Sequence, residues 1–219
     1  MRFPFLLILT SFLLITSCSQ SKSEPPIVVS NGEKEVNIIF ENEVSSLTEF
    51  EYQELTEEAT NILEENPVSS EEAERWFIRY YIQKEESRET WTNDEMLKMA
   101  EERVDYEKAW KAYAYLEYGI SATEEAIESQ IQYNLEVYRN SLPPAIQGIS
   151  SGLDITIEEY LIEFDRDHVE RTVTWQKLMP ILLEKHRNES AERLDGVYLG
   201  KKFEEEVREY METQSHGEQ

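Results

Sequence analysis

The stretch of residues 106–186 constrains the fold most, because long helical periodicities alternate there with clear signals for helix ends and helix starts. Gly119 follows the first periodic segment, at the position where a left-handed residue closes a helix. Ser121 and Glu124 then give the Ser-x-x-Glu pattern of a capping box, which satisfies free amides in a first helical turn. The pattern predicts two helices joined by a short turn around Gly119.

Two further helices are predicted within the same stretch. Four-, four-, three- and four-residue spacings place one apolar set on a single helix face, namely Ile127, Ile131, Leu135, Tyr138 and Leu142. Pro143 and Pro144 should end this helix, and a Gly/Ser-rich loop should follow. Thr156 and Glu159 repeat the capping box and predict a long helix, kinked by Pro180. Its buried face should contain Ile157, Tyr160, Leu161, Phe164, Trp175, Met179 and Leu182.

The remaining chain also shows mostly helical periodicity. We expect helices over residues 46–65, after a cap at Ser69 or Ser70, from a cap at Asn93 to Tyr118, and over residues 201–213, with a turn at residues 85–91. Near the N-terminus, two short β-rich runs flank an Asn-Gly turn signal within residues 27–40, which predicts a hairpin. The predicted fold is therefore mainly α-helical, with a small N-terminal β-hairpin.

Composition supports a folded chain with an acidic surface. Hydrophobic residues make up 40% of the 219 residues and aromatic residues 11%, which is enough for one core. Formal net charge is −25, from 21 Lys and Arg against 46 Asp and Glu. Such a surface repels the phosphates of nucleic acids and of anionic lipids. We therefore expect no nucleic-acid partner, and expect any membrane attachment to be covalent or hydrophobic.

The first 18 residues have the pattern of a bacterial lipoprotein signal. Arg2 precedes an apolar run at residues 3–15, which is too short to span a bilayer comfortably. Residues 15–18 read Ile-Thr-Ser-Cys, the lipobox pattern, and Cys18 is the only cysteine, which excludes an internal disulfide or a thiolate metal cluster. Lipidation of Cys18, with palmitate among the expected acyl groups, would hold the protein on the extracytoplasmic face of the cell membrane. The alternative is an ordinary secretory signal with an unmodified cysteine.

This interpretation divides the chain into four parts. Residues 1–17 are predicted to be the signal peptide, and residues 18–26 a lipidated flexible tether. Residues 27–213 should form the helical domain, and residues 214–219 a disordered tail. Removal of the signal peptide, whose only charged residue is Arg2, would take the net charge from −25 to −26.

Residue types that carry catalysis form no recognisable constellation. The sequence has no Gly-rich phosphate loop and no Glu-x-x-His pair. His168 falls on an apolar stripe, where a packed histidine is expected, and carboxylates are too numerous to single out an acid/base pair. We expect no enzyme, and no catalytic residue, metal or cofactor. Binding of divalent cations by acidic faces is a third hypothesis, although no Asp-x-Asp-x-Asp-Gly loop occurs.

A family resemblance rests on the helix-ending and helix-starting residues. Residues 114–128, Ala-Tyr-Leu-Glu-Tyr-Gly-Ile-Ser-Ala-Thr-Glu-Glu-Ala-Ile-Glu, resemble the N-terminal chaperone domain of SurA-type and PrsA-type foldases. Residues 154–161 and the amphipathic run that follows resemble the next helix of that family. The resemblance covers roughly residues 31–185, but residues 34–46 intervene where the family passes quickly into a helix. No segment resembles a parvulin-type prolyl isomerase domain, and residues 183–219 leave too little room for such a domain of about a hundred residues.

The resemblance implies a SurA-like, trigger-factor-like peptide-binding domain that holds unfolded or exported polypeptides without isomerising them. The acidic surface should add attraction for basic segments of such polypeptides. The candidate peptide-binding residues are Trp110, Tyr113, Tyr138 and Trp175, because their rings combine apolar bodies with polar tips. Aromatic residues at helical spacing are also typical of a core, so core placement is the alternative for each.

A second functional hypothesis belongs to a different class. The chain could be a non-enzymatic adaptor or assembly lipoprotein that docks one dedicated envelope or spore-related partner. The two hypotheses predict different surfaces. A holdase chaperone predicts a concave, exposed apolar groove, whereas an adaptor predicts a flat patch with a polar rim.

Overall fold

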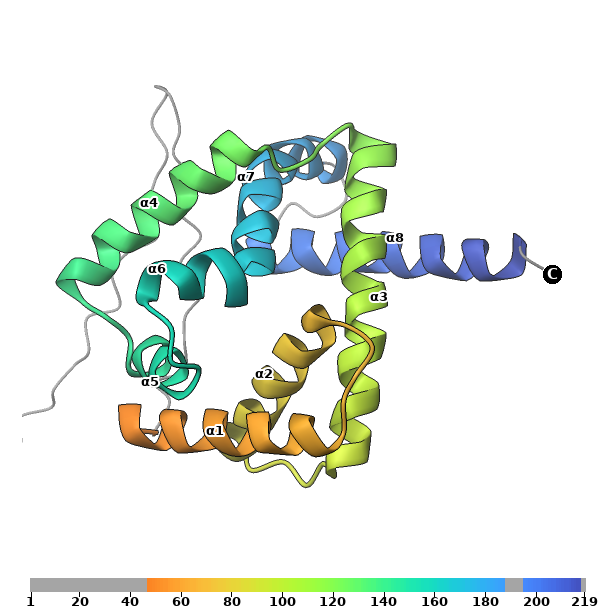
Figure 1. The fold of residues 1–219 in the computed structure, drawn as a ribbon. Coiled ribbons are helices and arrows are strands. Elements are labelled where there is room, and N and C mark those ends of the chain that lie inside the picture. The colour runs from red at the N-terminus through yellow and green to blue at the C-terminus, as the bar shows by residue number, and fades with distance from the viewer. Residues whose placement is uncertain (1–46, 188–194, 218–219) are drawn as a thin grey trace, which may run out of the picture. The chain divides into compact units, whose positions relative to one another are not determined.

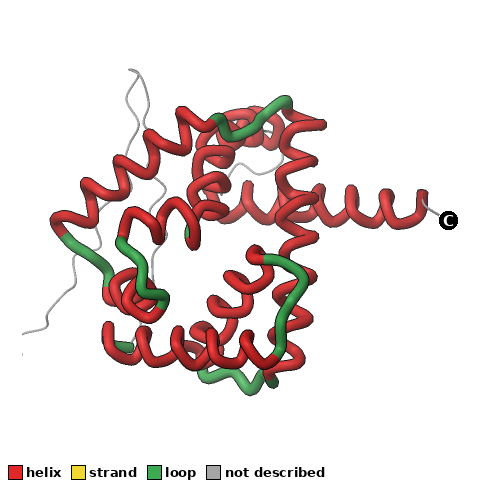
Figure 2. Tube along the Cα trace, in the orientation of Figure 1, coloured by secondary structure: helices red, strands yellow, loops and turns green. Residues whose placement is uncertain are grey.

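The computed structural model of this chain describes residues 47–187 and 195–217. These residues are mainly α-helical, as predicted, and none of them belongs to a strand (Figure 2). Cys18, the predicted tether and the predicted hairpin of residues 27–40 lie outside the described residues and stay predictions. No helix within the described ranges is long and apolar enough to cross a membrane.

The helices follow one another with short connections (Figure 1). Their order is α1 (Glu49–Glu65), α2 (Glu71–Ser87), α3 (Asn93–Tyr118), α4 (Glu124–Asn140), α5 (Pro144–Gly152), α6 (Ile157–Glu159), the π-helical turn η1 (Tyr160–Phe164), α7 (Arg166–His186) and α8 (Gly196–Gly217). α1 ends before Pro67, as predicted. The turn expected at residues 85–91 is shorter, because α2 continues to Ser87 and ends at Arg88 in a left-handed conformation.

Several predicted helix boundaries are confirmed. Ser70 caps α2 by accepting a hydrogen bond from the backbone N–H of Ala73. Gly119 closes α3 with a φ of 66°, a conformation that a residue without a Cβ adopts at low cost. Thr156 and Glu159 form the reciprocal capping box. The local signals therefore suffice at these three positions.

Two predicted caps are wrong by one or two residues. Thr92, not Asn93, caps α3: its hydroxyl accepts from the N–H of Glu95, and the Glu95 carboxylate accepts from the N–H of Thr92 at 2.8 Å. Thr123, not Ser121, caps α4. The carbonyl oxygen of Ser121 instead accepts from Lys177 of α7 at 3.1 Å. In both cases a threonine one or two residues from the predicted residue takes the capping position, and the helix starts at the residue after that threonine.

The Gly/Ser-rich loop predicted after Pro143 is wrong, because this segment forms helix α5. Pro144 occupies its first turn, where the fixed φ of proline suits a helix. Gly148 and Gly152 lie one turn apart against α1. A Cβ at Gly148 would lie 2.3 Å from the carbonyl oxygen of Glu49, and one at Gly152 would lie 2.7 Å from the Cβ of Thr56. The glycines therefore allow two helix backbones to touch, which a sequence pattern read locally cannot show.

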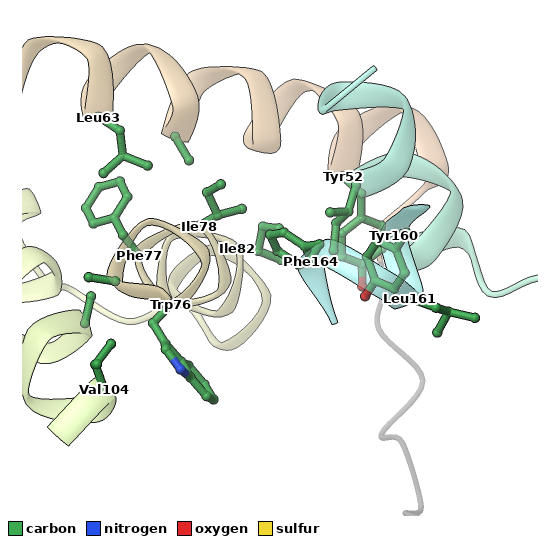
Figure 3. Close-up of a cluster of buried hydrophobic side chains, with 14 of the residues drawn as sticks. Tyr52, Leu63, Trp76, Phe77, Ile78, Ile82, Val104, Tyr160, Leu161 and Phe164 are labelled. Atoms are coloured by element: carbon green, nitrogen blue, oxygen red, sulfur yellow. The ribbon is translucent and has the colours of Figure 1, made fainter. Parts of the chain in front are cut away.

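Buried apolar residues form two separate clusters. The first core lies among α1, α2, α4, α5, η1, the N-terminal half of α3 and the start of α7. Figure 3 shows Leu63 of α1 pointing toward Phe77 of α2. The second core lies among α8 and the C-terminal halves of α3 and α7. Its buried members are Trp110, Ala114, Ile120, Leu178, Leu182, Leu199, Phe203 and Val207. α3 and α7 each contribute to both cores.

The last two helices differ from expectation. The long helix predicted from Thr156 is interrupted by η1 and restarts as α7 at Arg166, and it continues through Pro180 to His186. α8 begins at Gly196 rather than at residue 201 and runs through Gly217, past the predicted end at residue 213. The carboxylate of Asp195 accepts a hydrogen bond from the backbone N–H of Tyr198 at 2.8 Å, which explains the earlier start. The longer helix brings Leu199 into the second core.

Candidate functional site

The structure brings three of the four predicted peptide-binding residues together. Trp110, 1% exposed, belongs to the second core, and half-buried Tyr113 and Trp175 pack against that core. Tyr138 lies apart from them, packed against the first core. Burial, and next the charge of Asp165, raise the pKa of the Tyr138 hydroxyl to about 12. Trp110 therefore has the core placement that was the alternative reading, and Tyr138 does not share a site with the others.

The three aromatic residues meet around Phe203 of α8. The ring centroid of Phe203 lies 5.2 Å from Trp110, 5.7 Å from Tyr113 and 6.5 Å from Trp175. Tyr118 adds a fourth ring at 5.9 Å. We call these four rings the aromatic site. Centroid distances of this size, with tilted or edge-on planes, are favourable for aromatic pairs. Sequence reasoning missed Tyr118 and Phe203, although both lie on apolar helix stripes.

Helix periodicity explains how the site forms. On α3, the side chains of Trp110, Tyr113 and Ala114 are spaced three and four residues apart and share one face. Ala114 is fully buried, and its small side chain lets α8 approach α3 closely. On α7, Trp175, Leu178 and Leu182 share a face in the same way. α8 lies against both helices, and Figure 1 shows it crossing α3.

One carboxylate of α8 is held at the edge of the aromatic site. Both carboxylate oxygens of Glu206 accept hydrogen bonds: Oε2 from the hydroxyls of Tyr118 and Tyr113, the latter at 3.2 Å, and Oε1 from Lys185 Nζ at 2.7 Å. Burial alone would raise the pKa of Glu206, but the hydrogen bonds from Lys185 and Tyr118 outweigh it and lower that pKa. Burial and then the charge of Glu206 raise the pKa of Tyr113 to about 12. Glu206 is thus a fixed anion that accepts hydrogen bonds from both α3 and α7.

A layer of three charged side chains, of which only Glu107 is buried, lies between Trp76 of the first core and Trp110 of the second. Glu107 of α3 is buried, and its carboxylate lies 2.6 Å from Arg103 and 2.9 and 3.0 Å from Arg171. The guanidinium of Arg171 also lies over the ring of Trp110, 4.4 Å from the centroid. Paired and stacked guanidinium groups of this kind are costly to leave unpartnered, so they fix how α3 and α7 pack. The layer therefore orients Trp110 at the boundary of the aromatic site.

Arg79 of α2 holds the junction between η1 and α7. It donates two hydrogen bonds of 2.7 Å to the carboxylate of Asp167 and one of 2.6 Å to the carbonyl oxygen of Phe164. Its guanidinium lies 4.5 Å from the Trp76 ring centroid. Burial would raise the pKa of Asp167, but the hydrogen bonds and charge of Arg79 lower it to about 2. These contacts tie the start of α7 to the first core.

The histidines do not form a metal centre within the described residues. His168 is hydrogen-bonded, with Nδ1 2.7 Å from Asp165 Oδ1, but 45% of its side chain is exposed, so the prediction of a packed histidine is wrong. Its ring still packs edge-on against Trp76, with the two ring centroids 5.5 Å apart. His186 is buried near Glu206. No group of three or more His, Cys, Asp or Glu side chains is placed for metal ligation in these ranges.

An open concave region lies elsewhere, beside the connection between α1 and α2. It has a volume of about 530 Å³ and is lined by Glu65, Asn66, Pro67, Val68, Ser69, Leu97, Lys98 and Glu101. Most of these side chains are polar, and Glu101 is already bonded to the backbone and hydroxyl of Ser69. This region is therefore not the apolar groove that a holdase predicts.

α1 carries the strongest uncompensated charge in the described part of the chain. It contains seven glutamates and no lysine or arginine, and none of these glutamates forms an ion pair with another described residue. Phe50, on its outer side, is 62% exposed. The charge makes this helix face attractive to cationic groups and repulsive to anionic ones.

Comparison with family models, with curated proteins and with solved structures finds no match to this chain.

Proposed function

We propose that this protein binds polypeptide on the extracytoplasmic side of a bacterial membrane, to which a lipid on Cys18 anchors it, and that it does so without prolyl isomerase activity. The observation that carries the proposal is the contact between the aromatic site and α8. The face of α3 and α7 around Trp110 and Trp175 already accommodates an amphipathic helix through apolar contacts and one fixed carboxylate. An apolar face with a few placed polar groups is the arrangement that recognises helical peptides.

The resemblance to SurA-type and PrsA-type foldases supports the same proposal from the sequence. It assigns residues 31–185 to a peptide-binding domain and offers no isomerase segment. The acidic face of α1 supports a contribution from charge, because a cationic segment of an exported polypeptide would be attracted to it. These two lines are independent of the contact at α8.

A test of polypeptide binding is suppression of client aggregation. The chain from Ser19 onward is mixed with a reduced, unfolding client at low and high salt, and light scattering is followed. We expect suppression at substoichiometric to equimolar amounts. An acidic helical protein of similar net charge serves as the control. A loss of suppression at high salt would assign capture to charge, such as that of α1. No suppression at several-fold excess would overturn the holdase form of the proposal.

A test of the anchor uses Cys18→Ser in the complete chain. The unaltered protein expressed in a bacterium should incorporate labelled palmitate and sediment with membranes. The variant should incorporate none, because the thiol that receives the lipid is absent. Label in the variant, or no label in the unaltered protein, would overturn lipidation at Cys18.

The alternative, an adaptor that docks one dedicated partner, is favoured by a specific observation. The concave region near Pro67 is mostly polar, whereas the apolar face at the aromatic site is filled by one defined helix. A face shaped for one helix suits a dedicated partner better than varied unfolded clients. Crosslinking in the native membrane separates the two: one dominant product supports the adaptor, and many products support the holdase.

A further inference from the structure

α8 fills the second core as a bound helical peptide fills its receptor. Leu199, Phe203 and Val207 are at most 1% exposed and are spaced four residues apart, so they form one stripe along the helix. The opposite side carries exposed Lys201 and Glu205. The three apolar side chains are thus the anchors of an amphipathic helix laid on a complementary face.

The receiving face is made of residues that precede α8. We call it the α8-binding face, and its members are Trp110, Tyr113, Ala114, Tyr118, Ile120, Trp175, Leu178 and Leu182. These residues come from α3, from the turn after Gly119 and from α7. α3 and α7 are also held to the rest of the domain by contacts that do not involve α8: α3 packs on α2 in the first core, and Asp167 of α7 pairs with Arg79 of α2. The face is therefore anchored independently of the helix that covers it.

The charges around the α8-binding face favour a bound helix that carries carboxylates. The Glu206 carboxylate accepts hydrogen bonds from Lys185 Nζ, at 2.7 Å, and from the hydroxyls of Tyr113 and Tyr118. The carboxylate of Glu204 lies 3.9 Å from the guanidinium of Arg171. Among the described helices, α7 alone has more Lys and Arg than Asp and Glu, four against three. In a chain of net charge −25, the α8-binding face thus has two cationic groups at its edge, Lys185 and Arg171, of which Arg171 is also paired with Glu107.

We propose that the α8-binding face is a helix-binding site from which α8 is displaced by an amphipathic helix of another polypeptide. That helix carries apolar side chains where α8 has Leu199, Phe203 and Val207, and a carboxylate where α8 has Glu206. The inference rests on the proposed function and names its ligand class at this site: acidic amphipathic helices, not basic segments. α8 then acts as a resident competitor, so the apparent affinity for an added helix depends on the fraction of molecules whose face is free.

The experiment measures binding of a fluorescent peptide of residues 195–214 to the chain from Ser19 onward, by anisotropy. Phe203→Ala in the protein weakens its own α8, and we expect it to bind the peptide at least tenfold more tightly than the unaltered protein does. Val197→Ala is the matched control in the same helix, because Val197 is 69% exposed, and it should bind as the unaltered protein does. In the peptide, Phe203→Ala should lower affinity at least tenfold and Glu206→Gln about fivefold.

A second protein variant guards against loss of the fold. Glu206→Gln keeps all three apolar anchors of α8, and it should increase peptide affinity about threefold. Circular dichroism of each variant checks its helix content. Equal binding of the peptide to the unaltered, Phe203→Ala and Glu206→Gln proteins would overturn the proposal. Equal binding of all peptide variants to one protein would also overturn it.

The aggregation assay separates this inference from the proposed function. If the protein suppresses aggregation and saturating peptide does not reduce that effect, clients bind elsewhere, so the α8-binding face is not their site and the inference is overturned. If the peptide binds as expected but aggregation is not suppressed, the helix-binding site stands and the holdase function falls.

Discussion

The first core is closed by contact between helix backbones, whereas the second core is closed by aromatic rings and by hydrogen bonds to one carboxylate. α1 and α5 touch through Gly148 and Gly152, where no side chain fits. α8 meets α3 and α7 through Phe203 and Glu206. The contact between α1 and α5 is specific to these two helices, because it requires the missing side chains of Gly148 and Gly152. Side-chain contact of the second kind can be reproduced by any helix with the same stripe, which is why we place the binding site there.

The largest expected effect comes from emptying the aromatic site. Phe203→Ala should lower the free energy of unfolding by about 4 kcal/mol, because it leaves a cavity among four rings. Hydrogen exchange should quicken in α8 and the C-terminal half of α3 but not in α1 and α5. Val197→Ala, on the exposed side of α8, should change neither. Equal loss of protection in both cores would break the comparison, since the domain would then unfold as one unit.

A slightly smaller effect should follow from adding one methyl group to the first core. Gly148→Ala places a Cβ 2.3 Å from the carbonyl oxygen of Glu49, so α1 and α5 must separate, at a cost of about 3 kcal/mol in urea unfolding. Gly200→Ala is the matched control in α8. Its Cβ would lie 4.0 Å from the nearest atom, on Trp175, so it should be neutral or stabilise by about 0.5 kcal/mol. Equal costs at the two glycines would contradict the close contact.

Acid should weaken the junction between the cores. The pKa of Asp167 is lowered from 3.8 to about 2 in the fold, so the folded state favours its ionised form. The resulting stabilisation, about 2 kcal/mol, is present above the unfolded pKa and is lost as pH falls from about 4 to about 2. Asp167→Asn should remove this part of the pH dependence in urea titrations. Asp105→Asn, at an exposed position of α3, should keep it. Identical pH profiles for both variants would contradict the assignment to Asp167.

The smallest effect tests the polar half of the second core. Tyr118→Phe removes a hydroxyl that donates to Glu206 and accepts from Lys185, so it should cost about 1 kcal/mol. Tyr115→Phe, at a tyrosine 62% exposed, should cost nothing measurable. Thermal unfolding of the two variants gives the comparison. If Tyr118→Phe is also neutral, the carboxylate adds little to the second core, and the preference for acidic helices loses its support.

Much of the helical layout could be predicted because its signals are local. Gly119 ends α3, and the Thr156–Glu159 box starts the next helix, since both depend on hydrogen bonds within one turn. Ile127 and Ile131 are buried as periodicity predicts, whereas Leu135 and Tyr138 are only partly buried and Leu142 lies beyond the end of α4. The errors at Asn93 and Ser121 were small, because a better capping residue lay beside each.

The candidate site could be predicted only in part. Trp110, Tyr113 and Trp175 were named from their chemistry, and the structure brings them together. Tyr138 shares that chemistry but packs on the first core. Phe203, around which the rings of the aromatic site meet, comes from a helix nearly a hundred positions from Trp110. No spacing rule links residues so far apart, because only the crossing of α8 over α3 and α7 places their rings in contact.

By itself, the sequence determined the helical class, several helix boundaries and the net negative charge, because these follow from periodicity, capping chemistry and composition. It also contains the Ile-Thr-Ser-Cys pattern that ends at Cys18, on which the predicted location depends. The tertiary structure decided that residues 144–152 form a helix, since Gly148 and Gly152 are explained only by α1 beside them. It also decided which aromatic residues share a site and that a carboxylate lies at its edge. Those facts depend on which helix faces pack against each other, and that is decided only by the tertiary packing of the whole chain.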